Sequence, residues 1–169
     1  MRDLSRWIRL LASLWLGLLL TVAAVATPSA FATLPTPQAG LVVARVLASE
    51  AAASLVLGAA LLALMRLHVR QVDGSPASQF SLDFGLALCS VFMTVIGYYA
   101  VLPLMDQARA GLGRFSFAQL HVASSACFLL KACCVAALAW RTSAVAATAE
   151  TLLSPQPSSS GSPHASGDA

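Results

Sequence analysis

The chain has 169 residues, of which 58% are hydrophobic and only 10% are charged, and its formal net charge is +3. Soluble domains carry about 25% charged residues, so this composition excludes a stable water-soluble globule. The ten lysines and arginines are spread without a basic stripe, which argues against a nucleic-acid partner. The composition predicts an integral membrane protein whose surroundings are a lipid bilayer.

Four apolar runs are each long enough to cross a bilayer as a helix, which needs about 20 residues. They predict an all-α fold, a polytopic four-transmembrane-helix bundle with short loops in residues 1–141. The predicted helices cover residues 8–26, 38–66, 82–104 and 117–141. A membrane β-barrel is excluded because its strands are shorter and alternate in polarity.

The first run follows three arginines and breaks at Pro28. Its basic start, apolar stretch and A-x-A sequence at residues 24–26 also resemble a cleavable signal peptide, and cleavage near Ala26 would leave three helices. The apolar stretch is long for a signal peptide, so we favour a retained first helix. Trp15 would then contribute packing contacts to the bundle.

The second helix has a start signal well before Arg45, because Thr36 is a good N-cap residue and Pro37 suits the first helical position. Residues 73–76 (DGSP) predict a turn before the third helix. Small residues four positions apart predict close helix packing within the bundle or in a homodimer. These pairs are Ala48 with Ala52, Ser54 with Gly58, and Ser90 with Thr94.

The fourth helix is predicted to start at Phe117, because Ser116 and Gln119 form a capping-box pattern. Four of its residues recur on one helical stripe and are expected to face the other helices. They are Ser124, Cys127, Lys131 and Cys134. The remaining residues, 142–169, are predicted to be a disordered cytoplasmic tail, since serine, proline and glycine dominate from Ser154 onward.

Arginine placement predicts the orientation, because positive residues collect on the cytoplasmic side of a membrane. With the N-terminus inside, the inner side carries six arginines and the outer side three. The inner set is Arg2, Arg6, Arg9, Arg66, Arg70 and Arg141, and the outer set is Arg45, Arg109 and Arg114. Both termini are therefore predicted to be cytoplasmic.

A candidate intramembrane polar site consists of Glu50, His121, Ser124 and Lys131, because ionisable groups within a span are costly and should face the bundle interior. If Arg45 marks the outer surface, Glu50 and His121 lie at similar depth, which predicts a contact between them. If the second helix enters lipid nearer Pro37, this match weakens.

Lys131 is roughly 15 Å deeper than His121 along the fourth helix, which places it too far for easy pairing with Glu50. We favour an interpretation in which its long stem extends to the cytoplasmic interface near Arg141. The alternative is a buried cation that binds an anionic group.

Three stretches resemble a known family. They are residues 27–51 (TPSAFATLPTPQAGLVVARVLASEA), residues 97–111 (GYYAVLPLMDQARAG) and residues 115–141, with the pattern Phe-x-x-Leu-His-x-x-Ser and a following lysine. In order and spacing they resemble the four-helix membrane family called domain of unknown function 4149, related to eukaryotic transmembrane protein 205. The resemblance spans residues 5–141. It implies a multi-pass membrane protein, in bacteria an inner-membrane one, and the family has no established biochemical activity.

Three functions are compatible with this pattern. The favoured one is a non-enzymatic component that stabilises or assembles with other membrane proteins or as a homodimer. The second is a transporter or ion pathway lined by Glu50, His121 and Lys131, although the sequence has no inverted repeat and no helix broken within its span. The third is a metal- or haem-handling redox protein.

The third function would draw on one histidine and a set of sulfur side chains. These are His121, Cys89, Met93, Cys127, Cys133 and Cys134. One histidine with spaced thiols on a single helix does not make a tetrahedral site, so no metal, haem or other cofactor is predicted. Neither a catalytic triad, a phosphate loop nor a carboxylate pair is present in the sequence, so we expect no enzyme.

Overall fold

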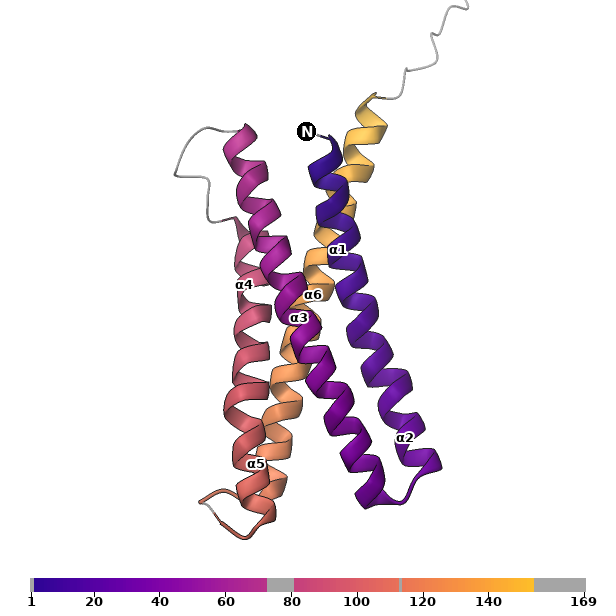
Figure 1. Ribbon diagram of the computed structural model, residues 1–169. Coiled ribbons are helices and arrows are strands. Elements are labelled where there is room, and N and C mark those ends of the chain that lie inside the picture. Colours follow the sequence, from indigo (N-terminus) through magenta and orange to yellow (C-terminus); the bar gives the residue numbers. More distant parts are fainter. Residues whose placement is uncertain (1, 73–80, 113, 154–169) are drawn as a thin grey trace, which may run out of the picture.

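Four long helical rods run alternately down and up in a computed structural model, which describes residues 2–72, 81–112 and 114–153 (Figure 1). Each rod contains a stretch long and apolar enough to cross a membrane. In chain order the elements are α1 (Arg2–Thr21), the π-helical turn η1 (Val22–Ala26), α2 (Thr27–Thr33), α3 (Thr36–Val72), α4 (Leu82–Val95), the π-helical turn η3 (Ile96–Val101), α5 (Leu102–Arg109) and α6 (Phe117–Leu153). The all-α prediction with four spans is confirmed.

The third and fourth rods begin at the predicted residues, Leu82 and Phe117, but all four rods are longer than predicted. The largest difference is in α6, which continues twelve residues past Arg141 to Leu153, so the disordered tail predicted from residue 142 is wrong up to that point. These added residues are rich in alanine and leucine, and the first helix-breaking proline is Pro155. The predicted turn at 73–76 and residues 154–169 lie outside the described residues.

Side-chain caps place the starts of the last two rods. The Ser116 N–H donates to Gln119 Oε1 at 3.0 Å, and the Gln119 N–H donates to Ser116 Oγ at 3.3 Å, so the predicted capping box is confirmed. Ser81 caps α4 by accepting from the Phe84 N–H at 3.2 Å. At the end of α5, Gly111 adopts a φ of 72°, which lets the chain leave the helix in a left-handed turn.

The first and third rods each contain a π-helical turn just before a proline. Pro28 and Pro103 are the second residues of α2 and α5, and a proline ring inside a helix collides with the carbonyl of the preceding turn. The wider π turn relieves this collision, so the first rod passes Pro28 and continues to Thr33 instead of ending there as predicted. The Thr27 hydroxyl also donates to the Val22 carbonyl at 2.9 Å.

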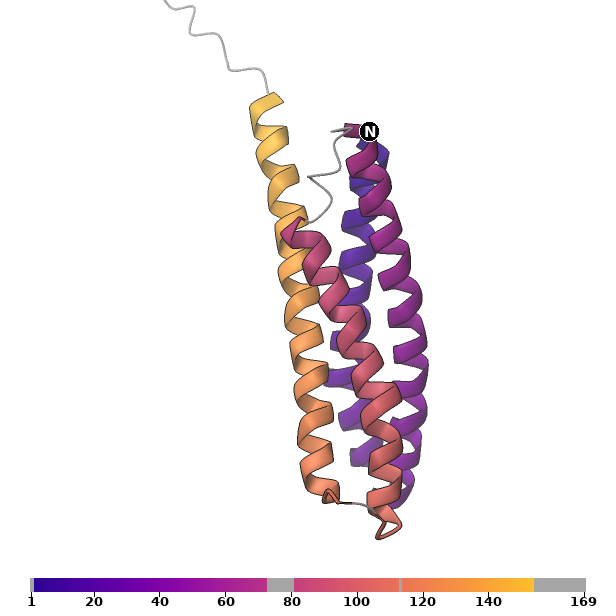
Figure 2. The ribbon, with the colours of Figure 1, turned by 90° about the vertical axis from the view of Figure 1, so that its left-hand side faces the viewer.

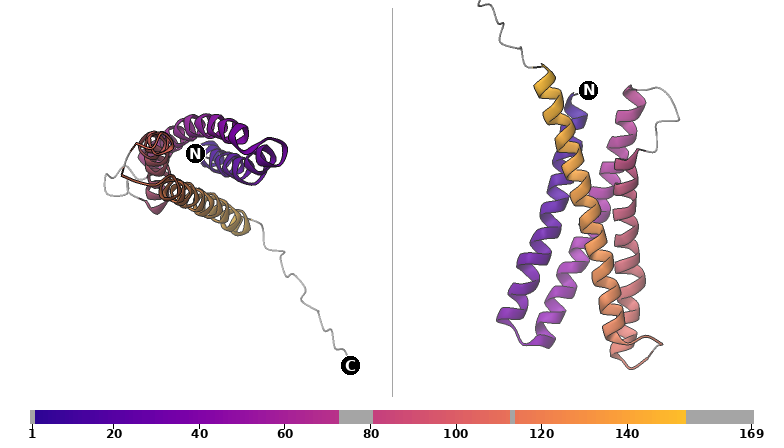
Figure 3. Two further views of the ribbon diagram at one scale, coloured as in Figure 1. Left: turned by 90° about the horizontal axis from the view of Figure 1, so that it is seen from below. Right: turned by 180° about the vertical axis from the view of Figure 1, so that it is seen from behind.

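The rods form two helical hairpins that are arranged as a ring. The first hairpin is residues 2–72 and the second is residues 81–153; contacts between them run from α1 to α6 and from α3 to α4. The elements α2 and α5, at the other end, make their main contacts within their own hairpin. The start of α1 and the last turns of α6 lie at the end where the hairpins converge, and the hairpins diverge toward the opposite end (Figures 1 and 3). We call these the termini end and the splayed end.

The core follows this division. At the termini end all four rods contribute to one apolar cluster, made of Ile8, Ala12, Leu61, Met65, Phe84, Ala87, Leu138 and Ala139. Next to it lies a cluster of Trp15, Leu19 and Val135. Toward the splayed end a separate cluster of Val101, Met105 and Leu120 belongs to the second hairpin alone. Seen from the side in Figure 2, the rods still run roughly parallel.

Small residues allow the rods to approach closely near the middle of the bundle. Ser54, Ser90 and Thr94 are buried. A Cβ atom added at Gly58 would lie 2.4 Å from Val91 Cγ2 and 3.1 Å from the Trp15 ring. Packing within the bundle is therefore confirmed for the Ser54–Gly58 and Ser90–Thr94 pairs.

Candidate functional site

The centre of the bundle contains an ion pair between diagonally opposite rods. The Lys131 Nζ atom of α6 lies 2.8 Å from Glu50 Oε1 and 2.9 Å from Glu50 Oε2 of α3. The side chains are 5% and 3% exposed, respectively, so neither charge reaches the surface of the bundle. The ammonium group also lies 4.8 Å from the centre of the Phe128 ring, a cation–π distance.

Two further side chains extend this pair into a hydrogen-bonded chain across three rods. The Ser54 hydroxyl, one turn along α3, donates to Glu50 Oε1. The Trp15 Nε1–H of α1 donates to the Ser54 oxygen at 2.8 Å. Trp15 and Ser54 are both fully buried. We call the four residues Trp15, Ser54, Glu50 and Lys131 the central network.

Helix geometry explains why Glu50 and Lys131 meet. Glu50 lies 14 residues after the start of α3 at Thr36, and Lys131 lies 14 residues after the start of α6 at Phe117. Both helices begin at the splayed end, so each charge lies roughly 21 Å along its helix. Because Glu50 and Lys131 lie at equal depth on α3 and α6, which face each other across the ring, their long side chains meet at its centre.

The predicted contact between Glu50 and His121 is wrong. His121 lies only four residues into α6, near the splayed end, where its exposed ring stacks on Phe117 with centroids 6.1 Å apart. The prediction measured depth from Arg45, but α3 begins nine residues earlier at Thr36. Glu50 is therefore deeper in the bundle than Arg45 suggested.

The prediction that Lys131 extends to the cytoplasmic interface is also wrong, since its ammonium group is buried against Glu50. The alternative interpretation was a buried Lys131 that binds an anionic group, and in the structure this group is the Glu50 carboxylate of the same chain. Ser124, the remaining predicted site residue, is half-buried two turns before Lys131 on the same face of α6. The structure therefore brings together two of the four predicted site residues.

The predicted stripe on α6 does face the bundle, with Lys131 and Cys134 buried and Ser124 and Cys127 half-buried. Cys134 Sγ lies 3.8 Å from Cys89 Sγ of α4, and Cys133 is exposed on another face. Within the described residues, no three histidine, cysteine or acidic side chains lie together as metal ligands would. The Cys89 and Cys134 sulfur atoms are part of the packing between α4 and α6.

The central network has a defined chemical capacity. Lys131 donates to both carboxylate oxygens, and Ser54 adds a third hydrogen bond to Glu50. Such a carboxylate has its charge balanced and its lone pairs largely used. The arrangement ties three rods together, and a group that displaced Lys131 from Glu50 would break a polar contact between the two hairpins.

Four apolar rods around a buried ion pair define a multi-pass membrane protein of the helical-bundle class. The sequence model of the family described as domain of unknown function 4149 matches residues 10–114. Because this match covers more than half of the chain, the protein belongs to that family. Neither the curated proteins nor the solved structures contain a match.

The matched segment contains three of the four members of the central network. Trp15, Glu50 and Ser54 lie within residues 10–114, whereas Lys131 lies beyond the segment on α6. Sequence reasoning named Glu50 and Lys131 but did not join them, and it treated Trp15 and Ser54 only as packing residues. The equal distances from Thr36 and Phe117 were the signal that could have joined the pair.

Proposed function

We propose that this protein is a non-enzymatic component of the membrane that assembles with a second copy of itself or with other membrane proteins. The observation that carries the proposal is the closed central network. Its charges and hydrogen-bonding groups are directed at one another and are buried, which is how a bundle fixes its own packing. A catalytic site would instead direct such groups toward a substrate.

The splayed end supplies the surface for assembly. There α2 and α5 make their main contacts within their own hairpins, and large apolar side chains are exposed on the helices. Leu41 on α3 is 71% exposed and Val122 on α6 is 68% exposed. Lipid covers such faces equally well, so the proposal depends on protein contacts being found there.

Site-specific photocrosslinking in intact membranes tests the assembly role. A photoreactive amino acid placed at Leu41 or Val122 should yield reproducible protein adducts, identified by mass spectrometry. The matched control is Leu10, which is 60% exposed on α1 at the termini end, where the hairpins already cover each other. Lipid adducts alone at Leu41 and Val122, or the same protein adducts from Leu10, would count against assembly through the splayed end.

A transport role is the second candidate, and one observation favours it. The ion pair joins one rod of each hairpin, so an ion or substrate that competes for Glu50 or Lys131 would change how the two hairpins pack. The π turns beside Pro28 and Pro103 add irregular backbone to one rod of each hairpin.

Flux measurements separate transport from assembly. Proteoliposomes of purified protein should carry an ion or small solute faster than empty liposomes, and the Glu50→Gln variant should abolish the difference. The matched control is His121→Gln, because His121 is exposed at the splayed end, outside the central network. Equal flux in the wild type and Glu50→Gln would remove the transport candidate and leave assembly.

We propose that the protein lies in the cell inner membrane, which the family resemblance implies. We propose that both termini are cytoplasmic, because the termini end carries six arginines. Reporter fusions that are active only outside the cytoplasm should stay silent at either terminus.

A further inference from the structure

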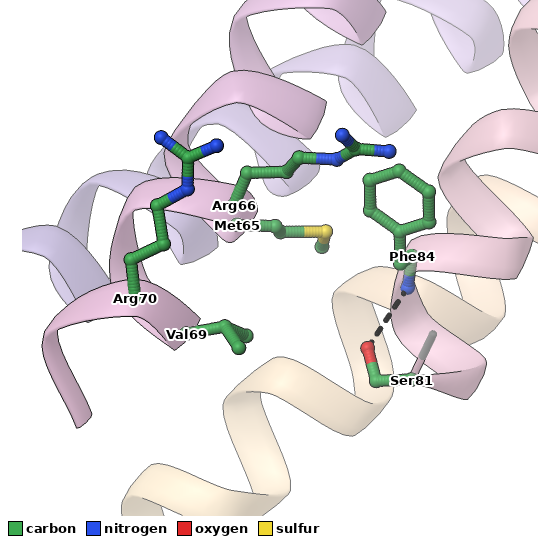
Figure 4. A pocket seen from close by; sticks show the side chains of 6 residues that line it. All are labelled: Met65, Arg66, Val69, Arg70, Ser81 and Phe84. Carbon is green, nitrogen blue, oxygen red and sulfur yellow. Dashed lines mark hydrogen bonds between the residues drawn. The ribbon is translucent and has the colours of Figure 1, made fainter. Parts of the chain in front are cut away.

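A pocket lies between the last turns of α3 and the start of α4, at the termini end of the bundle. Its lining residues are Met65, Arg66, Val69, Arg70, Ser81 and Phe84 (Figure 4). It is a shallow hollow that is open to the surroundings, with enclosed room for about one water-sized group, so a larger ligand would lie across its mouth. Two of the membrane-spanning stretches end here, at Arg70 and Leu82, so the pocket lies at the level of lipid headgroups.

The charge in this pocket is positive. Arg66 and Arg70 are four residues apart on α3, so both leave the helix on the same side, and both are exposed (Figure 4). The Arg66 guanidinium lies 5.0 Å from the centre of the Phe84 ring, which holds it over the pocket. Like charges at this spacing repel each other, so a bound anion would relieve the repulsion.

The nearest acidic group of α4 is directed elsewhere. Asp83 pairs with Arg141 of α6 at 2.5 Å, outside the pocket. Among the described residues, Arg66 and Arg70 take part in no ion pair. The first turn of α4, whose backbone N–H groups point toward the same end, adds a weak positive potential.

The rest of the wall is apolar. Met65 and Phe84 belong to the core cluster of the termini end, and Val69 continues that surface outward. Leu82, beside the pocket, is 62% exposed and faces the surroundings of the helix. Two cations above an apolar wall at headgroup level match a molecule with an anionic head and an acyl chain.

We propose that this pocket binds the phosphate headgroup of an anionic phospholipid, with Arg66 and Arg70 as its ligands and the acyl chain against Leu82 and Val69. The inference does not depend on the assembly role, because the pocket lies at the opposite end from the splayed faces. Under this proposal the termini end binds one class of lipid specifically, in addition to the non-specific lipid contacts that every transmembrane bundle makes.

Native mass spectrometry of the full chain in a nonionic detergent tests the proposal. The probes are phosphatidylglycerol and phosphatidylcholine with identical acyl chains. Wild type should retain phosphatidylglycerol in preference, and the Arg66→Gln/Arg70→Gln variant should bind it about 25-fold more weakly, at about fivefold for each arginine. Arg45→Gln, which removes one positive charge from α3 outside the pocket, should leave the affinity unchanged, whereas Arg66→Gln or Arg70→Gln alone should weaken binding about fivefold.

Two further variants separate the pocket from general charge and from misfolding. Arg66→Lys/Arg70→Lys keeps both charges and should keep the preference for phosphatidylglycerol. Val69→Phe keeps both arginines but fills the pocket, so it should lose the preference, whereas Leu67→Phe on the exposed face should keep it. Retained preference in Val69→Phe, or lost preference in Arg45→Gln, would overturn the proposal.

A last comparison distinguishes the lipid from a free anion. Inorganic phosphate at millimolar concentration should not displace phosphatidylglycerol, because it lacks the acyl chain that contacts the apolar wall. Displacement by inorganic phosphate would show that the pocket takes a soluble anion and would overturn the lipid assignment.

Discussion

At the scale of single residues, the Glu50–Lys131 pair has the largest energetic consequence. A lone charge at the centre of a span costs about 2.5–3.5 kcal/mol on insertion scales, and the attraction within the pair offsets part of that cost for both members. Breaking a buried pair by removing one partner typically costs 3–5 kcal/mol, whereas replacing both partners by apolar residues of similar volume is often neutral. The pair therefore specifies packing more than it adds stability.

A double-mutant cycle should reveal this dependence. Glu50→Leu and Lys131→Met are each expected to lower the free energy of unfolding by about 3–5 kcal/mol, because each leaves one buried charge without a partner. The double variant should lose at least about 2 kcal/mol less than the sum of the two. The measurement is reversible unfolding of the purified protein in mixed detergent micelles.

His121→Ala is the control for this cycle, since His121 is exposed and should change the free energy of unfolding by no more than about 0.5 kcal/mol. Additive losses in the double variant would contradict the pairing. If His121→Ala lowered the free energy of unfolding only in the Lys131→Met background, this result would indicate a contact between Glu50 and His121 after all.

The residues of the candidate site could be predicted in part. Their burial followed from being ionisable within apolar runs, which the sequence displays directly. Their pairing could be predicted only with the correct start of α3. The prediction placed the outer membrane surface at Arg45, but this residue lies nine residues inside the helix. The hydrogen bond from Trp15 to Ser54 spans 39 residues of sequence, and no local pattern encodes such a contact.

At the scale of helices, the two hairpins follow one plan. In each, a rod with a π turn and a proline is followed by a regular helix of 37 residues with an ionisable group 14 residues from its start. The helix start at Phe117 was predictable because its capping box is a local signal, and the start at Leu82 was predicted from the apolar run and the turn signal before it. The π turns were not, because proline usually ends a helix and only the surrounding packing carried the rod past Pro28.

Close packing at Gly58 gives a prediction for these helices. Gly58→Ala should lower the free energy of unfolding by about 1–3 kcal/mol, because the new methyl group would lie 2.4 Å from Val91 Cγ2 and press on Trp15. Gly85→Ala on α4 is the matched control, since a Cβ there meets nothing within 4 Å. It should be neutral or stabilise by up to about 1 kcal/mol through helix propensity.

Thermal unfolding in detergent compares the two glycine variants directly. Equal midpoints for Gly58→Ala and Gly85→Ala would show that α1, α3 and α4 do not meet as closely as the structure has them.

At the scale of the whole molecule, the first rod is part of the shared core. Trp15 and Leu19 are fully buried, and Ile8 and Ala12 belong to the cluster built by all four rods. Cleavage near Ala26 would remove these side chains and the hydrogen bond to Ser54. The fold therefore favours the retained helix over the signal-peptide interpretation.

Retention of the first rod can be measured directly. A short epitope tag at the N-terminus should remain on the membrane-embedded protein, and the intact mass should include residues 1–26. A mature protein that begins near residue 27 would contradict this expectation. A C-terminal tag serves as the loading control, because it is present in either case.

The sequence separation of the ion pair has a consequence for biosynthesis. Glu50 and Lys131 are 81 residues apart, so the ribosome completes α3 well before it makes α6. At a synthesis rate of about 5–20 residues per second, the ribosome adds Lys131 roughly 4–16 s after Glu50. During that interval we expect the nascent first hairpin to stay beside the insertion machinery, and to settle into lipid only when the last helix arrives.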